Sequence, residues 1–516
     1  MSENEPSSPK SNTLKDVKQL GLWASLASLS YVFWIVGGME MIERLAYYGV
    51  RTVSTIYATR PASEGGLGVT MATFGWLLFT WNLVQSLVPI FTGGISDRYG
   101  YKETIAASTA VKCIGYLVMA WIPTYTGFFI GAILLAFGTA IFKPGIQGTL
   151  IKASTRENSS MAWGVFYQTV NIGGWIGPLI ALQMRHLSWT YVFYANAAII
   201  CLNFILLLTY KEPGKEERLE RRRKIKAGEL KEESLVVESM KELVKPHLWV
   251  YLVIFSVWWF MFPMLWDVLP KFVDDWVDTR VIVSTLFGPD GTQNGVIHFL
   301  MGMKQNGLEI EPEGIVNINA LMIMLTCFLF AGLSAKMRAT TSLFVGTLLV
   351  VGALTLLGLY NFAWICVGAM VVFSIGEMLA SPKYSEFLGN IAPPDKKAMW
   401  IGFSQAPILI GWTLEGKIGP QLYHMFSSKD VLARELMMER GLSEEAVSEA
   451  SIPVGEAFQK LVEFTGESPE SLTHLLYHSN NVGYTWFVFS IVGVISAAMI
   501  YSYGLWIKKL SDNETS

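Results

Sequence analysis

The chain has 516 residues, of which 52% are hydrophobic and only 16% charged, and its mean hydropathy is +0.39. This apolar share lies well above that of an ordinary soluble domain and excludes a soluble globular protein. The net charge of −3 argues against nucleic acid as a partner, because nucleic-acid-binding proteins present a strongly basic surface. We therefore expect an all-α protein of the lipid bilayer.

Twelve apolar stretches are each long enough to cross a hydrocarbon layer of ~30 Å as a helix. The polar first eighteen residues show no cleavable signal peptide, so we expect the first stretch to remain as a span. The expected spans are 29–58, 69–97, 103–123, 126–151, 160–184, 189–210, 247–273, 315–335, 341–361, 363–390, 398–425 and 482–507.

Lysine and arginine concentrate in alternate connections between these stretches, including the terminal arms and the run "RRRKIK". Positive residues near helix ends stay on the cytoplasmic side. This distribution predicts that both chain ends are cytoplasmic, in a multi-pass protein of the cell (inner or plasma) membrane.

A highly charged segment divides the chain into two halves of six spans each. We expect a substrate cavity at mid-membrane between the halves, as transporters commonly have. The predicted parts are an N-terminal cytoplasmic arm, a six-helix bundle, a charged linker, a second six-helix bundle and a tail: residues 1–28, 29–210, 211–246, 247–507 and 508–516.

Two outer insertions interrupt the second half, at residues 274–313 and 427–480. The first has no clear period and leaves its structure open. The second is predicted to be helical, with Ser468 as an N-cap and Pro469 at the first position of a helix. It is either an external lid that takes part in gating or an addition with no role in transport.

Ionisable residues inside the predicted spans are the main functional signal. The segment "EMIERLAYYGVR" (residues 40–51) places charges and tyrosines on one helix face. Each charge would cost ~3 kcal/mol or more facing lipid, and seven would cost on the order of 20 kcal/mol, so we expect them to face one another or an aqueous cavity. The seven are Glu40, Glu43, Arg44, Arg51, Lys143, Asp267 and Glu377.

Four acids and three bases leave one carboxylate in excess, which a single proton would balance. A carboxylate desolvated by burial binds a proton near neutral pH, and a nearby cation releases it, so this set suggests proton coupling. A substrate carboxylate that engages Arg51 or Lys143 would free the partner acid and link the two binding events. The alternative is a static network of ion pairs that only holds the helices together.

None of the six histidines lies in the middle of a predicted span, so the carboxylates must carry the proton. No metal-ligand spacing, nucleophile elbow or phosphate loop rises above chance. We expect neither an enzyme nor a cofactor or metal, with the proton as coupling ion.

Several motifs resemble those of known transporters. "GGISDRYGYKETI" resembles the 2–3 loop signature of the major facilitator superfamily, in which Asp97, Arg98 and Lys102 would cap helix ends and support the cytoplasmic gate. "EMIERLAYYGVR" resembles the E-x-x-E-R-F-x-Y-Y-G-x-R motif of the proton-coupled oligopeptide transporter (POT/PTR) family, with Leu45 in place of the aromatic. "FGTAIFKP", "FYQTVNIGG" and "GEMLASPKYSEFLGNIAPP" resemble that family's segments in spans 4, 5 and 10.

The resemblance implies a twelve-helix major facilitator fold with two bundles that rock about a central site, driven by an inward proton gradient. It implies that Arg51 and Lys143 hold a peptide carboxylate, while Asn171 and Glu377, with Asn319 as a further candidate, hold the amino group.

The resemblance also assigns coupling and gating. It implies that Glu40, Glu43 and Arg44 couple protonation to binding, and that Tyr47 and Tyr48 line the cavity. Arg51 with an acid of span 7 would close the outer gate, and Lys143 with Glu377 the inner one.

Three positions depart from the family pattern. Pro270 occupies the usual acidic position of span 7, and Asp267, about one turn earlier, is the expected substitute. Gln85 or Ser86 stands where many members have tyrosine, and span 11 lacks the usual tryptophan after the glycine of "GFSQAP". The ligand is therefore a peptide of unusual preference, a modified amino acid or another small organic anion.

The sequence leaves three alternative functions open. The first is a proton-coupled symporter of di- and tripeptides or similar zwitterions, acting as a monomer in the lipid bilayer. The second is a facilitator or exporter of another small organic solute on the same fold. The third is a receptor or scaffold that binds without transporting, which would tolerate neutral replacements of Glu40 or Glu43 together with their partners.

Overall fold

The described part of the chain is helical throughout apart from its connections. No β-strand forms there, and an isolated β-bridge joins Met303 to Ile310. In the computed structural model, the described residues are 22–92, 96, 99–155, 158–227, 245–391 and 403–514.

The helices of the first half begin with a short helix, α1, at the start of the described chain. They are α1 (Leu22–Ala27), α2 (Tyr31–Arg51), α3 (Ser54–Thr59), the short 3-10 helix η2 (Ala62–Glu64), α4 (Met71–Thr92), α6 (Tyr101–Trp121), α7 (Tyr125–Ala153), α8 (Ser159–Arg185) and α9 (Trp189–Leu208). The predicted linker contains α10 (Lys215–Lys226).

The second half begins with three consecutive helical pieces where one span was predicted. The pieces are α12 (Pro246–Trp259), α13 (Met264–Asp267) and α14 (Leu269–Trp276). The other long helices are α18 (Ile318–Ala335), α19 (Ala339–Leu359), α20 (Ala363–Ile391), α22 (Gln405–Phe426) and α27 (Tyr484–Glu514).

Both insertions contain short helices. The prediction that residues 427–480 are helical is confirmed, and Ser468 caps α26 by accepting a hydrogen bond from the Ser471 backbone N–H, with Pro469 at the first position. The first insertion contains α15 (Arg280–Phe287), α16 (Gly295–Met301) and α17 (Pro312–Val316); the second contains α23 (Lys429–Glu439), α24 (Glu444–Val447), α25 (Ala457–Thr465) and α26 (Pro469–Ser479).

Each of the twelve predicted stretches contains helix in the structure. Within the described residues, eight helical segments are long and apolar enough to cross a membrane. The other four stretches form α2, α4, α8 and α22, and α2 carries four charged residues, so the count of twelve spans remains a prediction.

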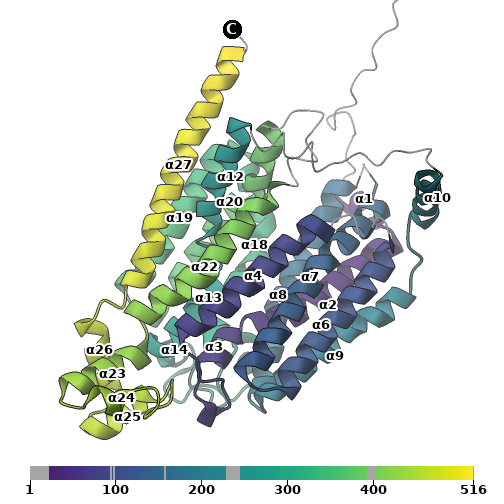
Figure 1. The fold of residues 1–516 in the computed structure, drawn as a ribbon. Coiled ribbons are helices and arrows are strands. Elements are labelled where there is room, and N and C mark those ends of the chain that lie inside the picture. The colour runs from purple at the N-terminus through teal and green to yellow at the C-terminus, as the bar shows by residue number, and fades with distance from the viewer. Residues whose placement is uncertain are drawn as a thin grey trace, which may run out of the picture.

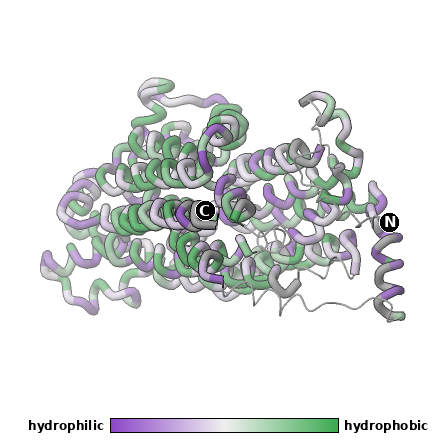
Figure 2. Tube along the Cα trace, turned by 90° about the horizontal axis from the view of Figure 1, so that it is seen from above, coloured by the Kyte–Doolittle hydropathy of each residue, from purple (hydrophilic) through white to green (hydrophobic). Residues whose placement is uncertain are grey.

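The helices stand in two groups that correspond to the two halves of the sequence, as Figures 1 and 2 show from two directions. Within the first half α2 packs against α8 and α9, and within the second α19 packs against α20 and α27. The most extensive contact between the halves is that of α4 with α22. α1 and the C-terminal end of α27 lie at one end of the molecule, which we name the termini end; α23 to α26 lie at the opposite, insertion end (Figure 1).

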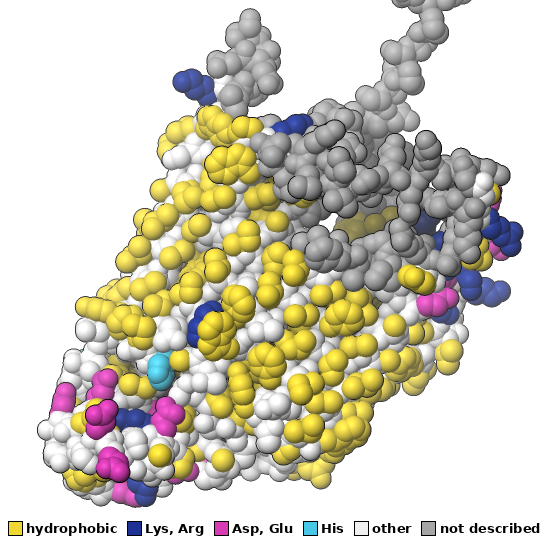
Figure 3. Space-filling view, viewed as in Figure 1, with side chains coloured by type: hydrophobic (Ala, Val, Ile, Leu, Met, Phe, Trp, Pro, Cys, Tyr) yellow, Lys and Arg dark blue, Asp and Glu magenta, His cyan; other side chains and the backbone are white. Residues whose placement is uncertain are grey.

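Large hydrophobic side chains cover the outer surface of the helices. Figure 3 shows them spread over one face, while charged side chains gather at the lower left, where α23 to α26 lie. Examples of half or more exposed side chains are Trp76, Ile114, Phe328, Leu329 and Ile491. Such an apolar belt is what a protein surrounded by lipid requires.

Candidate functional site

The charged face of α2 is turned to the interior of the first half. Ser30 begins the helix by accepting a hydrogen bond from the Phe33 backbone N–H, and the chain turns after Arg51. Arg44 lies between two glutamates: its Nε is 3.3 Å from Glu40 Oε1, and its Nη2 pairs with Glu43 Oε2. All three side chains are buried, as the cost of a charge in lipid requires.

Lys112 on α6 joins this cluster, and the sequence analysis missed it. Its Nζ donates to Glu43 Oε1 at 3.1 Å, and the side chain is only 1% exposed. Thr139 Oγ1 donates to the same oxygen at 3.2 Å. Gly138 leaves room for the lysine, because a Cβ there would lie 2.4 Å from Lys112 Cγ. The available signal was a lone lysine in the predicted span 103–123.

Arg51, at the end of α2, pairs with Asp267 of α13. Arg51 Nη2 lies 2.6 Å from Asp267 Oδ1, and both side chains are buried. The guanidinium also lies over the Trp81 ring, 5.2 Å from its centroid. Asp267 therefore occupies the place in which the family resemblance expects an acid opposite this arginine.

Gln85 on α4 binds two aromatic side chains near Arg51. Its position is one of the two at which the family that the sequence resembles often has a tyrosine. Its Oε1 accepts hydrogen bonds from Tyr47 OH at 2.9 Å and from Trp81 Nε1 at 3.1 Å. Tyr47 is consequently buried against α4 and does not line the central cavity.

Glu415 on α22 is the second residue that the sequence analysis missed. It is 0% exposed, and its helix packs against α13, which carries Asp267. Neither oxygen of its carboxyl group accepts a hydrogen bond from the described residues. Its sequence signal was an acid in "TLEGKIGP", inside the predicted span 398–425.

A cavity of ≈ 230 Å³ lies between the two halves. This is below the roughly 300 Å³ of the smallest sites for drug-sized ligands, so it suits a small solute. The predicted binding residues Tyr48, Asn171, Asn319 and Glu377 line it. Its aromatic lining consists of Tyr48, Tyr167, Trp259, Phe262, Trp266 and Trp412.

Polar groups in the cavity are organised around Glu377 on α20. Asn319 Nδ2 donates to Glu377 Oε2 at 2.9 Å and to Ser374 Oγ at 3.1 Å. Asn171 Nδ2 donates to the Tyr167 carbonyl oxygen at 2.8 Å. An acid among aromatic rings can bind a protonated amine through both charge and cation–π contact.

The predicted carboxylate-binding cations do not line this cavity. Arg51 is paired with Asp267, and Lys143, whose side chain is exposed, makes no ion pair with Glu377, although both residues are described. The predicted inner gate between Lys143 and Glu377 is therefore not formed in this conformation.

Of the predicted gate residues, the structure describes Lys102, in the first turn of α6. Asp97 and Arg98 lie outside the described residues. Lys102 Nζ donates to the Tyr210 carbonyl oxygen at 2.8 Å, just beyond the end of α9, and lies 4.8 Å from the centroid of that tyrosine ring. A cation is favourable at this position because the C-terminal end of a helix carries partial negative charge.

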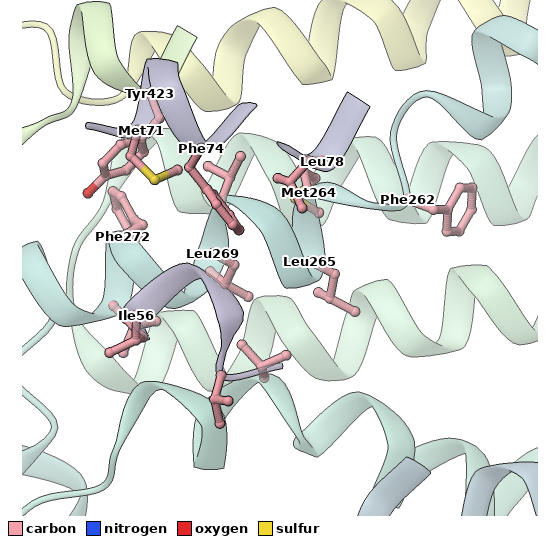
Figure 4. Packing of buried hydrophobic residues seen from close by; sticks show 14 of the residues in the cluster. Ile56, Met71, Phe74, Leu78, Phe262, Met264, Leu265, Leu269, Phe272 and Tyr423 are labelled. Carbon is pink, nitrogen blue, oxygen red and sulfur yellow. The ribbon is translucent and has the colours of Figure 1, made fainter. Parts of the chain in front are cut away.

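The insertion end is closed by apolar contacts between the halves. Figure 4 shows Ile56 of α3 and Met71, Phe74 and Leu78 of α4 close to side chains of α13, α14 and α22. Asn82 Nδ2 donates to the Trp412 carbonyl oxygen at 2.9 Å across the same contact.

Ion pairs add to this closure. Besides Arg51 with Asp267, the first half contributes Arg60 and Arg185. Arg60 lies 3.2 Å from Asp274, and Arg185 lies 2.6 Å from Glu311 and also pairs with Glu313. Within the described residues, every ion pair between the halves lies at this end.

The sequence profile described as Major Facilitator Superfamily matches residues 44–414 of the chain. The uncharacterized transporter YclF of Bacillus subtilis (strain 168) is 26% identical over 170 residues, so the match covers 32% of this chain and about a third (34%) of that one. A Na(+), Li(+), K(+)/H(+) antiporter of Planococcus maritimus is 22% identical over 72% of this chain and 91% of its own.

A solved structure has the same fold. A POT family transporter in complex with 5-aminolevulinic acid superposes with a TM-score of 0.64 at 14% identity, covering 96% of this chain and 99% of the other. The resemblance to these transporters that the motifs predicted is confirmed in superfamily and fold.

Proposed function

This chain belongs to the major facilitator superfamily, and on that premise we propose that it is a proton-coupled symporter that imports short peptides or similar zwitterions by alternating access. The proposal places it as a monomer in the cell (inner or plasma) membrane, with both chain ends in the cytoplasm. The observation that carries it is the cavity between the halves with its single acid, Glu377, adjoining two buried charge clusters.

Glu377 is the proposed site of the substrate's amino group. Asn319 holds one oxygen of this carboxyl, and the aromatic rings around it exclude water and stabilise a cation. Asn171 lies on the opposite wall and supplies a neutral polar group. Side chains of the solute meet mainly flat aromatic surfaces, which favours a site that tolerates varied peptides.

The charge count supports an exchangeable proton. Lys112 and Glu415 bring the seven predicted ionisable residues to five acids and four bases, one of which, Lys143, is exposed, so the acids outnumber the bases. Glu40, Glu43 and Arg44 form the proposed coupling cluster on α2. An acid that binds a proton in one conformation and a cation in another transfers the free energy of the gradient to the solute.

The two gates follow from the same set of charges. In the proposed orientation the closed insertion end faces outward, and Arg51 with Asp267 is part of its closure. When this end opens, Arg51 is free to bind a substrate carboxylate, and Lys143 is the proposed partner of Glu377 at the closed inner gate.

Uptake of labelled dialanine into proteoliposomes tests the proposal. We expect accumulation with an inward proton gradient, loss of accumulation without it, and loss in Glu43→Gln, because an amide can neither bind nor release the coupling proton. A folded wild-type protein that accumulates no dialanine under the gradient would contradict peptide symport.

A second candidate is transport of another small organic solute, in which the proton is exchanged or not used. Two observations favour it: no lysine or arginine lines the cavity, and a relative over most of the chain is named a cation/proton antiporter. Competition by small amines that carry no carboxylate separates the two. Strong inhibition by such amines and none by dialanine would select the second candidate.

A further inference from the structure

We propose that a second cavity, at the insertion end, binds a small molecule that carries both a carboxylate and an amino group, and that this occupant holds the end closed. The chemical class is that of an amino acid or a short peptide. The cavity shares no lining residue with the one around Glu377. The inference therefore goes beyond the proposed transport and assigns a regulatory site.

The second cavity has a volume of ≈ 600 Å³, more than twice the ≈ 230 Å³ of the central one. It falls within the range of roughly 300–1,000 Å³ that is usual for ligand sites. The connection from α3 to α4 forms its wall in the first half, and α14, the end of α22 and the second insertion form the remainder. The exposed acids Glu435, Glu444 and Glu449 line it, so the cavity opens to solvent on the outer side of the proposed orientation.

The second insertion reaches across to the first half beside this cavity. A Cβ at Gly455 would lie 2.9 Å from Pro61 Cδ and 3.2 Å from the Thr59 carbonyl oxygen, so this glycine packs directly on the first half. Ser63 Oγ donates a hydrogen bond to Glu456 Oε1 at 2.7 Å. The walls of the cavity come from both halves, and the cavity is therefore complete only while this end is closed.

Lys429, at the start of α23, supplies a cation without an acidic partner. Its Nζ donates to the Asp275 carbonyl oxygen at 3.0 Å and lies 3.9 Å from the centroid of the Phe458 ring. The Asp275 carboxylate pairs with Lys271 instead, and no carboxylate of the described residues forms an ion pair with Lys429. An ammonium group has three N–H donors, so donors remain for a carboxylate of the ligand.

The remaining charges of the lining favour an amino group as the other end of the ligand. The other lysine and arginine side chains there are paired with carboxylates: Arg60 with Glu64 and Asp274, Lys271 with Asp274 and Asp275, and Arg434 with Asp430. Glu435, Glu444 and Glu449 form no ion pair with the described residues. One free ammonium and three free carboxylates complement a molecule that carries both signs of charge. A metal ion is not the expected occupant, because the described residues contain no cluster of three or more side chains suited to one.

An occupant of this cavity acts on the conformational equilibrium of the protein. It contacts both halves in the closed state and loses its wall in the first half when the insertion end opens. A ligand that binds one state better shifts the equilibrium toward that state by its difference in affinity. The occupant therefore opposes opening, and it links the concentration of solute outside to alternating access.

Binding of labelled tetraalanine to the purified protein in detergent is the first test. The wild type should bind tetraalanine about tenfold more tightly than its C-terminal amide, which is the effect of losing a hydrogen bond between charged groups. Lys429→Met should bind both forms equally and weakly, whereas Lys460→Met, which changes an exposed lysine outside the lining, should behave as the wild type. Equal affinities of the wild type for both forms, or loss of binding in Glu377→Gln instead of Lys429→Met, would overturn the inference.

Chemical protection of Lys429 is a second test and needs no variant. Burial lowers the pKa of Lys429 to about 8. At pH 8 a large share of this amine is therefore neutral and attacks acetic anhydride, which forms an amide and releases acetate and a proton. Saturating tetraalanine should reduce acetylation of Lys429 several-fold and leave that of the exposed Lys460 unchanged, as measured by mass spectrometry of peptide fragments. Unchanged acetylation of Lys429 would contradict binding at this lysine.

The third test determines whether the occupied state is the closed one. Ser63→Cys and Glu456→Cys, on a cysteine-free background, replace two side chains that touch between the halves, and a short bismaleimide can join them. The cross-linked protein should bind tetraalanine at least as tightly as the same protein before cross-linking, and loss of binding would overturn the inference. None of the three measurements uses transport, so a failure of dialanine uptake would count against peptide symport alone.

Discussion

Glu43 is held by three donors that come from three different helices. Arg44 follows it on α2, Lys112 reaches it from α6 and Thr139 from α7. A buried carboxylate is tolerated only when its charge and its lone pairs are matched, and here two cations and a hydroxyl do so. The pattern explains why a lysine lies in the middle of α6, whose other charged residues, Lys102 and Glu103, are in its first turn.

Removing this lysine should destabilise the protein through the charge that it leaves behind. We expect Lys112→Met to lower the thermal unfolding midpoint, since breaking a buried ion pair costs about 3–5 kcal/mol. Lys112→Met combined with Glu43→Gln should recover much of the loss, because the unmatched carboxylate is gone. Tryptophan fluorescence during heating in detergent measures this. Lys460→Met, which breaks an exposed pair with Glu463, should change little, and an equal effect of both lysine variants would contradict the assignment.

At the scale of helices, the approach of α19 to α20 depends on two glycines. A Cβ at Gly346 would lie 2.6 Å from the Gly376 carbonyl oxygen, and a Cβ at Gly376 would lie 2.6 Å from that of Gly346. Close backbone approach of this kind is how helices associate in lipid, where burial of apolar surface gives no driving force. The pair fixes the packing of the second half independently of the transport site.

Gly346→Ala should force these helices apart and destabilise the protein by about 1–3 kcal/mol. Gly352→Ala on the same helix is the matched control, since a Cβ there meets nothing within 4 Å, and alanine is the better helix former by about 1 kcal/mol. Thermal unfolding midpoints measured side by side should fall for the first variant and stay or rise for the second. A similar change of the unfolding midpoint in both variants would show that the close approach of α19 to α20 does not determine the stability of the protein.

At the scale of the whole molecule, the first insertion ties the two halves together at one end. Glu311 and Glu313 flank the start of α17 and bind Arg185 at the end of α8. Burial alone would raise the pKa of Glu311, but the polar contact with His186, whose Nε2 lies 3.6 Å from Glu311 Oε1, and the charge of Arg185 outweigh it and lower the pKa to about 2. Residues 274–313 therefore contribute to closure, which their sequence left open.

The pH dependence of this closure follows from the direction of that shift. A carboxyl group whose pKa is lower in the closed state than the usual ~4.3 stabilises that state fully above ~4.3, and the contribution is lost as pH falls toward 2. The ion pair of Arg185 with Glu311 should therefore be intact from pH 8 to pH 5. Arg185→Ala should open the insertion end over this whole range, because two buried carboxylates lose their cation.

Spin labels on a cysteine-free background, at Leu187→Cys and Val296→Cys, report the distance between the halves at this end. Both positions are exposed, at 68% and 67%. We expect the distance distribution of the wild type to stay the same between pH 8 and pH 5, and that of Arg185→Ala to gain a longer component. A distribution for Arg185→Ala that matches the wild type at both pH values would show that apolar contacts alone keep this end closed.

The sequence by itself determined the class of protein, the helical stretches and the superfamily, and it pointed to four of the residues that line the cavity. Apolar length fixes which segments can be helices in lipid, and an isolated charge in such a segment must find a partner, so both are local properties that a sequence displays. Ser468 and Pro469 at the start of α26 follow from the same kind of local rule. Lys112 and Glu415 carried that signal too and belonged in the predicted set.

Which charges meet was decided only by the tertiary structure. Lys112 and Glu43 are 69 positions apart in sequence, and Asp267 of the second half pairs with Arg51 of the first. The same packing separates Lys143 from Glu377 and leaves the cavity with an acid and no lysine or arginine. A sequence gives the number and sign of buried charges, whereas their pairing depends on helix orientation and on the conformation that the two halves adopt.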